Sequence, residues 1–172
     1  MKNALSREEK EKLENIYYSF LNDSKIARMK DISMHRGSNC FIHSFLVAKL
    51  AIKRAMRKKK KLDLESILVA SILHDYYLYD WRSDKKLLKK HGSRHPYIAS
   101  GNAKRDFNIN DDVKNIILSH MWPINFKCFP KSKEAFIVNC ADTFVALREA
   151  MSSKKRKAKR ANERLEYISE LF

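Results

Sequence analysis

Hydrophobic residues recur along the chain at the spacing of amphipathic helices. The first helix is predicted over 6–22, where Ser6 and Glu9 have the spacing of a capping box. A longer helix is predicted over 40–57. One of its faces carries a histidine and three aliphatic residues at i, i+3, i+4 and i+7, namely His43, Leu46, Val47 and Leu50.

Polar caps and chain breakers divide the rest of the chain into further helices. Asp63 is placed to cap a buried helix that contains the apolar run ILVASIL (67–73) and continues to about 76. Gly92 is expected to end one basic helix, and His95-Pro96 to open the next, because Pro favours a first turn. The other predicted segments are a short helix in 24–34, a turn at 35–39, helices over 84–91, 95–107 and 110–121, a loop to about 131, and a helix from 132 past 150.

Composition supports a helical protein. Only three Gly and three Pro occur in 172 residues, and no strand pattern is found, so the sequence predicts an all-α fold of about seven to nine helices. We expect one domain over 1–151 and a strongly basic helical tail over 152–172. The three cysteines lack C-x-x-C spacing, the N-terminus is polar and the apolar runs are too short for a membrane span. We therefore expect a cytoplasmic protein with reduced thiols and no membrane span, and the sequence leaves its oligomeric state open.

The chain carries a large excess of positive charge. It has 36 Lys and Arg against 20 Asp and Glu, a formal net charge of +16. Such an excess attracts phosphorylated metabolites, nucleic acid and anionic lipid, and does not choose among them. A coding bias toward lysine explains the excess equally well.

Several side chains that can bind a metal lie on apolar stripes of separate predicted helices. His43 shares its helix face with aliphatic residues, and His74 and Asp75 follow the buried run 67–73. His120 and Asp142 lie on the apolar stripes of two later helices. Since such stripes meet in one core, these five side chains could meet as well.

Burial of these groups requires partners. A lone histidine on an apolar face is more often a hydrogen-bonded core residue than a ligand. Two inward carboxylates are costly to bury, however, and together with three inward histidines they suggest a shared cation. Ligation by histidine and carboxylate suits Fe, Mn, Co, Ni or Zn.

The order of these residues resembles a known signature. The set His43 … His74-Asp75 … Asp142 is similar to the H…HD…D pattern of the HD-domain superfamily, metal-dependent phosphohydrolases with an all-α fold. The flanking sequences agree over about 35–146, in HRGSNCFIHSFLVAKLA (35–51), LVASILHD (68–75) and IVNCAD (137–142). The resemblance implies one or two divalent transition-metal ions. One would be held by His43, His74, Asp75 and Asp142, and the other by a bridging Asp75 with His95 and His120.

The resemblance also implies a reaction and a class of substrate. A hydroxide generated at the Asp75 site would hydrolyse a small phosphorylated substrate such as a nucleotide. His35, in a turn near His43, is a candidate catalytic residue. Candidates for binding the phosphate are Arg36, Arg82 and Arg94, for each of which solubilising surface charge is the simpler explanation.

The chain departs from the family pattern after the HD pair. HDYYLYDW lacks the Gly-Lys continuation of many members, Thr143 stands where many have Lys, and no GYP-type segment is present. These differences affect the usual phosphate contacts and leave the metal ligands intact. The aromatic residues near the motif could stack a nucleobase or pack in the core; they are Tyr76, Tyr77, Tyr79, Trp81 and Trp122. Asp80 is read as a cap, and His91 as a structural residue at a helix end.

Two other functions remain open. The basic runs RKKKK (57–61) and SKKRKAKR (153–160) are typical of a nucleic-acid-binding module. A metal-bound structural or sensory domain without turnover is also compatible with the same ligands.

Overall fold

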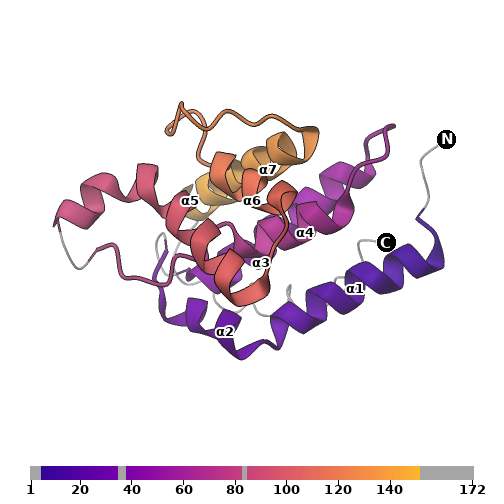
Figure 1. Ribbon diagram of the computed structural model, residues 1–172, viewed down its shortest axis with the longest axis horizontal. Helices are drawn as coiled ribbons and strands as arrows, with labels where there is room; N and C mark the ends of the chain where they lie inside the picture. The colour runs from indigo at the N-terminus through magenta and orange to yellow at the C-terminus, as the bar shows by residue number, and fades with distance from the viewer. Residues whose placement is uncertain (1–4, 35–37, 83–84, 152–172) are drawn as a thin grey trace.

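The computed structural model describes residues 5–34, 38–82 and 85–151, whose arrangement is shown in Figure 1. In chain order they form α1 (Arg7–Leu21), α2 (Ser24–Ala27), the 3-10 helix η1 (Arg28–Asp31), α3 (Cys40–Met56), α4 (Leu64–Leu73), α5 (Lys85–Phe107), α6 (Asp111–Ser119) and α7 (Lys133–Met151). These ranges contain no strand, only an isolated bridge between Ser33 and Asn39. The predicted all-α fold is confirmed, with seven α-helices in the part described. The proposed basic tail, 152–172, lies outside it.

The short, apolar helix α4 is the centre of the fold. Its residues are apolar on all sides, and seven of its ten are buried: Ser66, Ile67, Leu68, Ala70, Ser71, Ile72 and Leu73. A helix without a polar face must be covered on every side. It is covered by α1, α3, α5, α6 and α7, which pack around it (Figure 1). The residues that follow Leu73, the last residue of α4, therefore lie in the interior.

Polar residues cap the starts of several described helices. Ser6 and Glu9 form the predicted capping box of α1. Asp63 and Asn110 accept backbone N–H groups of α4 and α6, at 3.0 and 2.9 Å. Asn39 does the same for α3, where its side chain accepts the N–H of Ile42 at 2.9 Å. These caps set where each helix starts, and hence which side chains reach its inner face.

The predicted break between 84–91 and 95–107 is wrong, because α5 is one continuous helix with Pro96 inside it. A proline there removes one helical hydrogen bond, but packing of α5 on α6 outweighs that loss. Gly92 does not end a helix. A Cβ at Gly92 would lie 3.4 Å from Cγ2 of Ile124 and 3.8 Å from Cε of Met121. Both distances are ordinary van der Waals contacts, so α5 lies close to the chain that follows α6 at this point.

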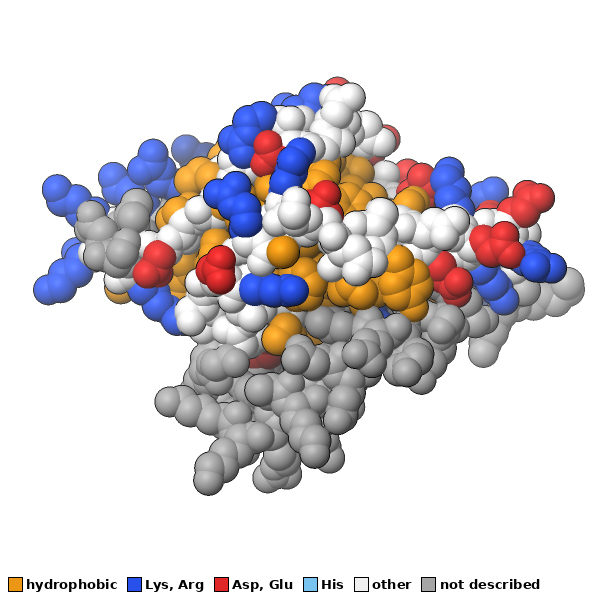
Figure 2. Space-filling view, turned by 90° about the horizontal axis from the view of Figure 1, so that it is seen from below, with side chains coloured by type: hydrophobic (Ala, Val, Ile, Leu, Met, Phe, Trp, Pro, Cys, Tyr) orange, Lys and Arg blue, Asp and Glu red, His pale blue; other side chains and the backbone are white. Residues whose placement is uncertain are grey.

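The described surface is mixed in charge. On the face shown in Figure 2, Lys and Arg side chains are spread over several elements and stand beside acidic ones. Among the helices of the described ranges, none is both long and apolar enough to cross a membrane.

Removing the cap of α4 should destabilise the whole fold. Asp63 accepts the N–H of Ser66 at 3.0 Å and its hydroxyl at 2.7 Å, and α4 packs against five other helices. We expect Asp63→Ala to lower the free energy of unfolding by about 1 kcal/mol. Urea denaturation followed by circular dichroism measures this. The exposed Asn15→Ala on α1 is the control, and equal stability of both variants would contradict the prediction.

Candidate metal centre

Six side chains predicted as ligands meet in the interior from five helices or their ends. Each is buried: His43 on α3, His74 and Asp75 at the end of α4, His95 on α5, His120 at the end of α6, and Asp142 on α7. They form three overlapping groups in which the ligand atoms lie within 4.8 Å of one another and could hold a metal ion. The sequence separates these residues by up to 99 positions, and only the packing of the bundle unites them.

Three of the histidines are oriented by backbone carbonyls of their own helices. Nδ1 of His74 lies 2.8 Å from the carbonyl oxygen of Ser71, and Nδ1 of His120 lies 2.7 Å from that of Ile117. Nδ1 of His95 lies 2.9 Å from the carbonyl oxygen of His91. A carbonyl oxygen can only accept, so each Nδ1 carries the hydrogen. Each Nε2 then turns toward the cluster, as in histidines that bind metals.

Two of these histidines stand where helices end. His74 and His120 are the C-cap residues of α4 and α6, which were predicted to continue to about 76 and 121. The last carbonyls of a helix lack i+4 partners, and here those of Ser71 and Ile117 bind the imidazoles. The C-terminal ends of α4 and α6 also bring negative partial charge toward the centre. This arrangement favours a cation.

Asp75 lies between two pairs of histidines. Its Oδ2 is 3.5 Å from Nε2 of His74 and 4.0 Å from Nε2 of His43. Its Oδ1 is 3.3 Å from Nε2 of His95 and 3.8 Å from Nε2 of His120. The two oxygens of one carboxylate thus face different sides of the cluster, as a bridging ligand requires.

Asp142 contacts the same two histidines that face Oδ2 of Asp75, His43 and His74. Its Oδ1 is 3.0 Å from Nε2 of His43 and 3.6 Å from Nε2 of His74. The side chain comes from the inner face of α7. Both carboxylates therefore share the same two histidines.

Among the described residues, three imidazole nitrogens in the cluster lack a hydrogen-bond donor, which favours a cation beside them. Nε2 of His95 and Nε2 of His120 lie 2.8 Å apart, although both rings already donate from Nδ1. Two such nitrogens present lone pairs to each other and require a positive charge nearby. Nε2 of His74 is buried and has no hydrogen-bond partner among the described residues. The donor set fits a divalent transition-metal ion.

The pKa values of the clustered side chains agree with this. Burial lowers the pKa of His43, but hydrogen bonds to Asp142 and Glu149 outweigh it and raise the pKa to about 10. Burial works against ionisation of Asp75 and Asp142, yet the surrounding histidines hold both carboxyl pKa values well below the usual range. Burial and the neighbouring His74 and His95 lower the pKa of His120 to about 3. Ionised carboxylates, a neutral His120 and a proton on His43 therefore coexist near neutral pH, and a metal ion would replace that proton.

Glu149 completes the cluster and was not identified from the sequence. It is buried on α7, and its Oε2 lies 3.0 Å from Nδ1 of His43. Its Oε1 accepts the hydroxyl of Ser38 at 2.8 Å. The sequence could have indicated this residue, because Glu149 follows Asp142 by seven positions and therefore shares its helix face. Of the four histidines, His43 alone has a carboxylate rather than a carbonyl at Nδ1.

The aromatic stretch after the HD pair begins with two residues that pack in the core. Tyr76 and Tyr77 are buried, and their hydroxyls bond to Asp106 Oδ2 at 3.0 Å and to Cys40 Sγ at 3.1 Å. These two rings pack in the core, so stacking on a nucleobase is excluded for them. Oδ1 of Asp80 accepts the N–H of Arg82 at 3.0 Å within a turn that precedes α5, and its reading as a cap stays a prediction.

His91 packs against the ring of His95, one of the predicted ligands. Its ring stacks on Trp81 at 4.7 Å and on His95 at 4.4 Å between centroids. Its Nδ1 bonds to the hydroxyl of Tyr79 at 2.9 Å. The structural role predicted for His91 agrees with these contacts, whereas its predicted place at a helix end is wrong, because it lies within α5.

Of the residues suggested for binding phosphate, Arg82 and Arg94 are described, and neither lies in the cluster. His35 and Arg36 lie outside the described residues. Arg82 donates to the carbonyl of Met34 at 2.7 Å, and its guanidinium lies 4.5 Å from the centroid of the Trp81 ring. Arg94 is exposed on α5, one residue before His95.

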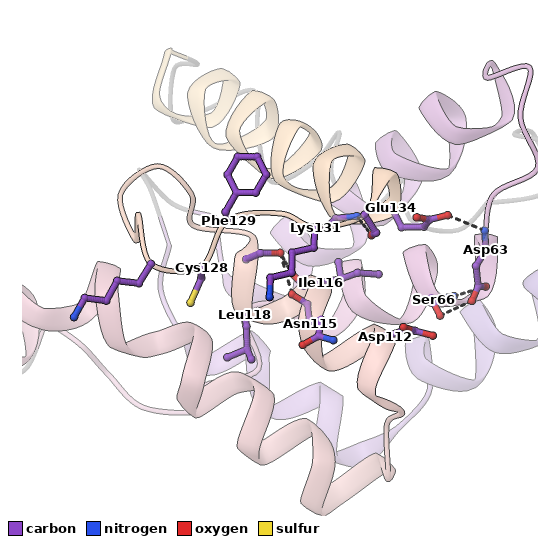
Figure 3. Close-up of a pocket in the computed structure, with 14 residues that line it drawn as sticks. Asp63, Ser66, Asp112, Asn115, Ile116, Leu118, Cys128, Phe129, Lys131 and Glu134 are labelled. Atoms are coloured by element: carbon purple, nitrogen blue, oxygen red, sulfur yellow. Dashed lines mark hydrogen bonds between the residues drawn. The ribbon is translucent and has the colours of Figure 1, made fainter.

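A separate surface pocket lies between α6, the start of α7 and the loop between them (Figure 3). Its walls combine carboxylates such as Asp112 and Glu134 with Lys131. None of the six clustered residues lines it. The mixed charge gives it no evident ligand.

Comparison with known families agrees with the fold and the cluster. The model of the HD domain matches residues 40–147, which is more than half of the chain. The protein belongs to the HD-domain family. No curated protein and no solved structure matches the chain significantly.

Neutralising Glu149 should weaken metal binding without dismantling the site. In Glu149→Gln an amide oxygen can still accept from His43, but the charge that makes the imidazole more basic is lost. We expect the affinity for Mn²⁺, measured by calorimetric titration, to fall about 10- to 100-fold. Glu134→Gln, at the start of the same helix, is the matched control. Equal affinities of the two variants would rule out this role.

Proposed function

We propose that this protein is a metal-dependent phosphohydrolase that acts on a small phosphorylated substrate, such as a nucleotide. The observation that carries the proposal is the position of Asp75, whose two oxygens face two separate pairs of histidine Nε2 atoms. Membership of the HD-domain family supports the same reaction class.

The residues divide naturally into two sets of ligands. Oδ2 of Asp75 faces His43 and His74, which Oδ1 of Asp142 also contacts, and these four residues would hold one divalent ion. His95 and His120 face Oδ1 of Asp75 and would hold a second. Fe, Mn, Co, Ni and Zn all suit such ligands.

The protein contributes orientation and electrostatics. A divalent ion in such a site acidifies water and neutralises charge on a phosphoryl group. The backbone carbonyls and Glu149 fix the direction of the imidazoles, so little reorganisation is needed when a ligand binds. The two buried carboxylates stay ionised and keep the site ready for a cation. Water is added across a P–O bond, which yields a phosphate and an alcohol.

The substrate is expected to be anionic. The chain as a whole carries +16. We propose Arg36, Arg82 and Arg94 as residues that bind the non-transferring phosphates, and His35 as a candidate catalytic residue. Of these, Arg82 and Arg94 are exposed on the segments next to His95 and the HD pair.

Activity should require both the metal and Asp75. We expect the metal-loaded protein to hydrolyse nucleotides or p-nitrophenyl phosphate, chelation to abolish turnover, and Mn²⁺ to restore it. Asp75→Asn should lower kcat/KM by more than about 100-fold, because a ligand of both sides is weakened. Asp112→Asn, exposed at the start of α6, is the control.

The outcomes separate the remaining hypotheses. A protein that binds metal tightly but turns over no phosphoester would be a structural or sensory domain. Binding of nucleic acid through 57–61 and 153–160 stays a prediction. It would show as an affinity that falls steeply with salt.

A further inference from the structure

The helix α7 has an apolar face on each side. The inner face carries Asp142 and Glu149 and packs in the core. The outer face carries a second stripe that is exposed, at spacings of 4, 4, 3 and 4 residues: Phe136 (38%), Cys140, Phe144 (47%), Leu147 (59%) and Met151 (78%). We call these five residues the outer stripe. An exposed helix face normally carries polar residues, so a continuous apolar stripe marks a contact surface.

Neighbouring aromatic residues extend the outer stripe at its N-terminal end. The ring of Phe129 lies 5.5 Å from that of Phe136, and the ring of Trp122 lies 6.3 Å from it. Figure 3 shows the Phe129 side chain beside α7. At the middle of the stripe, the guanidinium of Arg54 lies 5.2 Å from the centroid of Phe144. The surface thus runs along all of α7 and has a positive charge beside it.

The segment that follows α7 in the sequence has a pattern suited to this surface. In ANERLEYISELF (161–172), Leu165, Ile168 and Phe172 recur at i, i+3 and i+7. The glutamates 163, 166 and 170 share the opposite side of that pattern. Three Glu against one Arg make the segment acidic in a chain whose net charge is +16. It therefore offers one apolar side that fits the outer stripe and one acidic side that would face solvent.

The connection is long enough for the segment to reach the outer stripe. Residues 152–160, SSKKRKAKR, are polar or charged except for one alanine, so they favour solvent. Nine residues span up to about 30 Å when extended. The 19 residues of α7 measure about 28 Å along the helix. The segment can therefore return along any part of α7.

We propose that residues 161–172 pack against the outer stripe of α7 in the same chain. This interaction braces, from outside, the helix that carries Asp142 and Glu149 on its inner face. It does not depend on the proposed hydrolase activity.

The thiol of Cys140 lies on the outer stripe and can report whether it is covered. The full chain with Cys128→Ser is treated with a thiol reagent, and modification of Cys140 is followed by mass spectrometry. Cys40 is buried and is not expected to react. We expect Cys140 to react about tenfold faster when Leu165→Ser and Ile168→Ser are added, because they remove the apolar contacts.

The control places the same new residues on the opposite side of the segment. Glu163→Ser with Glu170→Ser should leave the rate within about twofold of the parent. Equal rates in the parent and in the Leu165→Ser, Ile168→Ser chain would overturn the proposal. Protection that appears only with dimers, detected by light scattering across protein concentrations, would also overturn it, since a second copy would then cover the stripe.

Discussion

The burial of two carboxylates among four imidazoles is the constraint on which the structure depends. An ionised carboxylate in a core is stable only when charge and hydrogen bonds surround it. Asp75 and Asp142 obtain both from His43, His74, His95 and His120, within 3.0 to 4.0 Å. No single helix could supply such a set. The bundle must therefore bring five helices to one point, with the apolar α4 in the middle.

Helix termini solve a second problem at the same point. The last turns of α4 and α6 contain carbonyls without the usual i+4 partner, and inside a protein these must be satisfied. Ser71 and Ile117 satisfy theirs with the Nδ1–H groups of His74 and His120. The same bonds aim both Nε2 atoms at the centre. The free carbonyls at the two helix ends thus orient two of the predicted ligands, His74 and His120.

The helix α7 joins the interior to the surface. Asp142 and Glu149 lie on one side of it, and an apolar stripe lies on the other. Glu149 also receives the hydroxyl of Ser38, which ties the start of α3 to the end of α7. The position of this helix consequently affects both His43, through Glu149, and the cluster itself. A surface contact on its outer side would act on the same element.

The sequence by itself determined the fold class, most helix starts and the six clustered residues. Periodicity and local capping carry that information, and the order of His43, His74-Asp75 and Asp142 resembles the HD-domain pattern. It misplaced a break in α5, because the packing that keeps a helix intact through Pro96 is not local. It missed Glu149, whose role exists only once α7 packs beside His43. The tertiary structure alone decided that the oxygens of Asp75 face different histidine pairs and that Tyr76 and Tyr77 are core residues, since both depend on distances between helices that no spacing along the chain encodes.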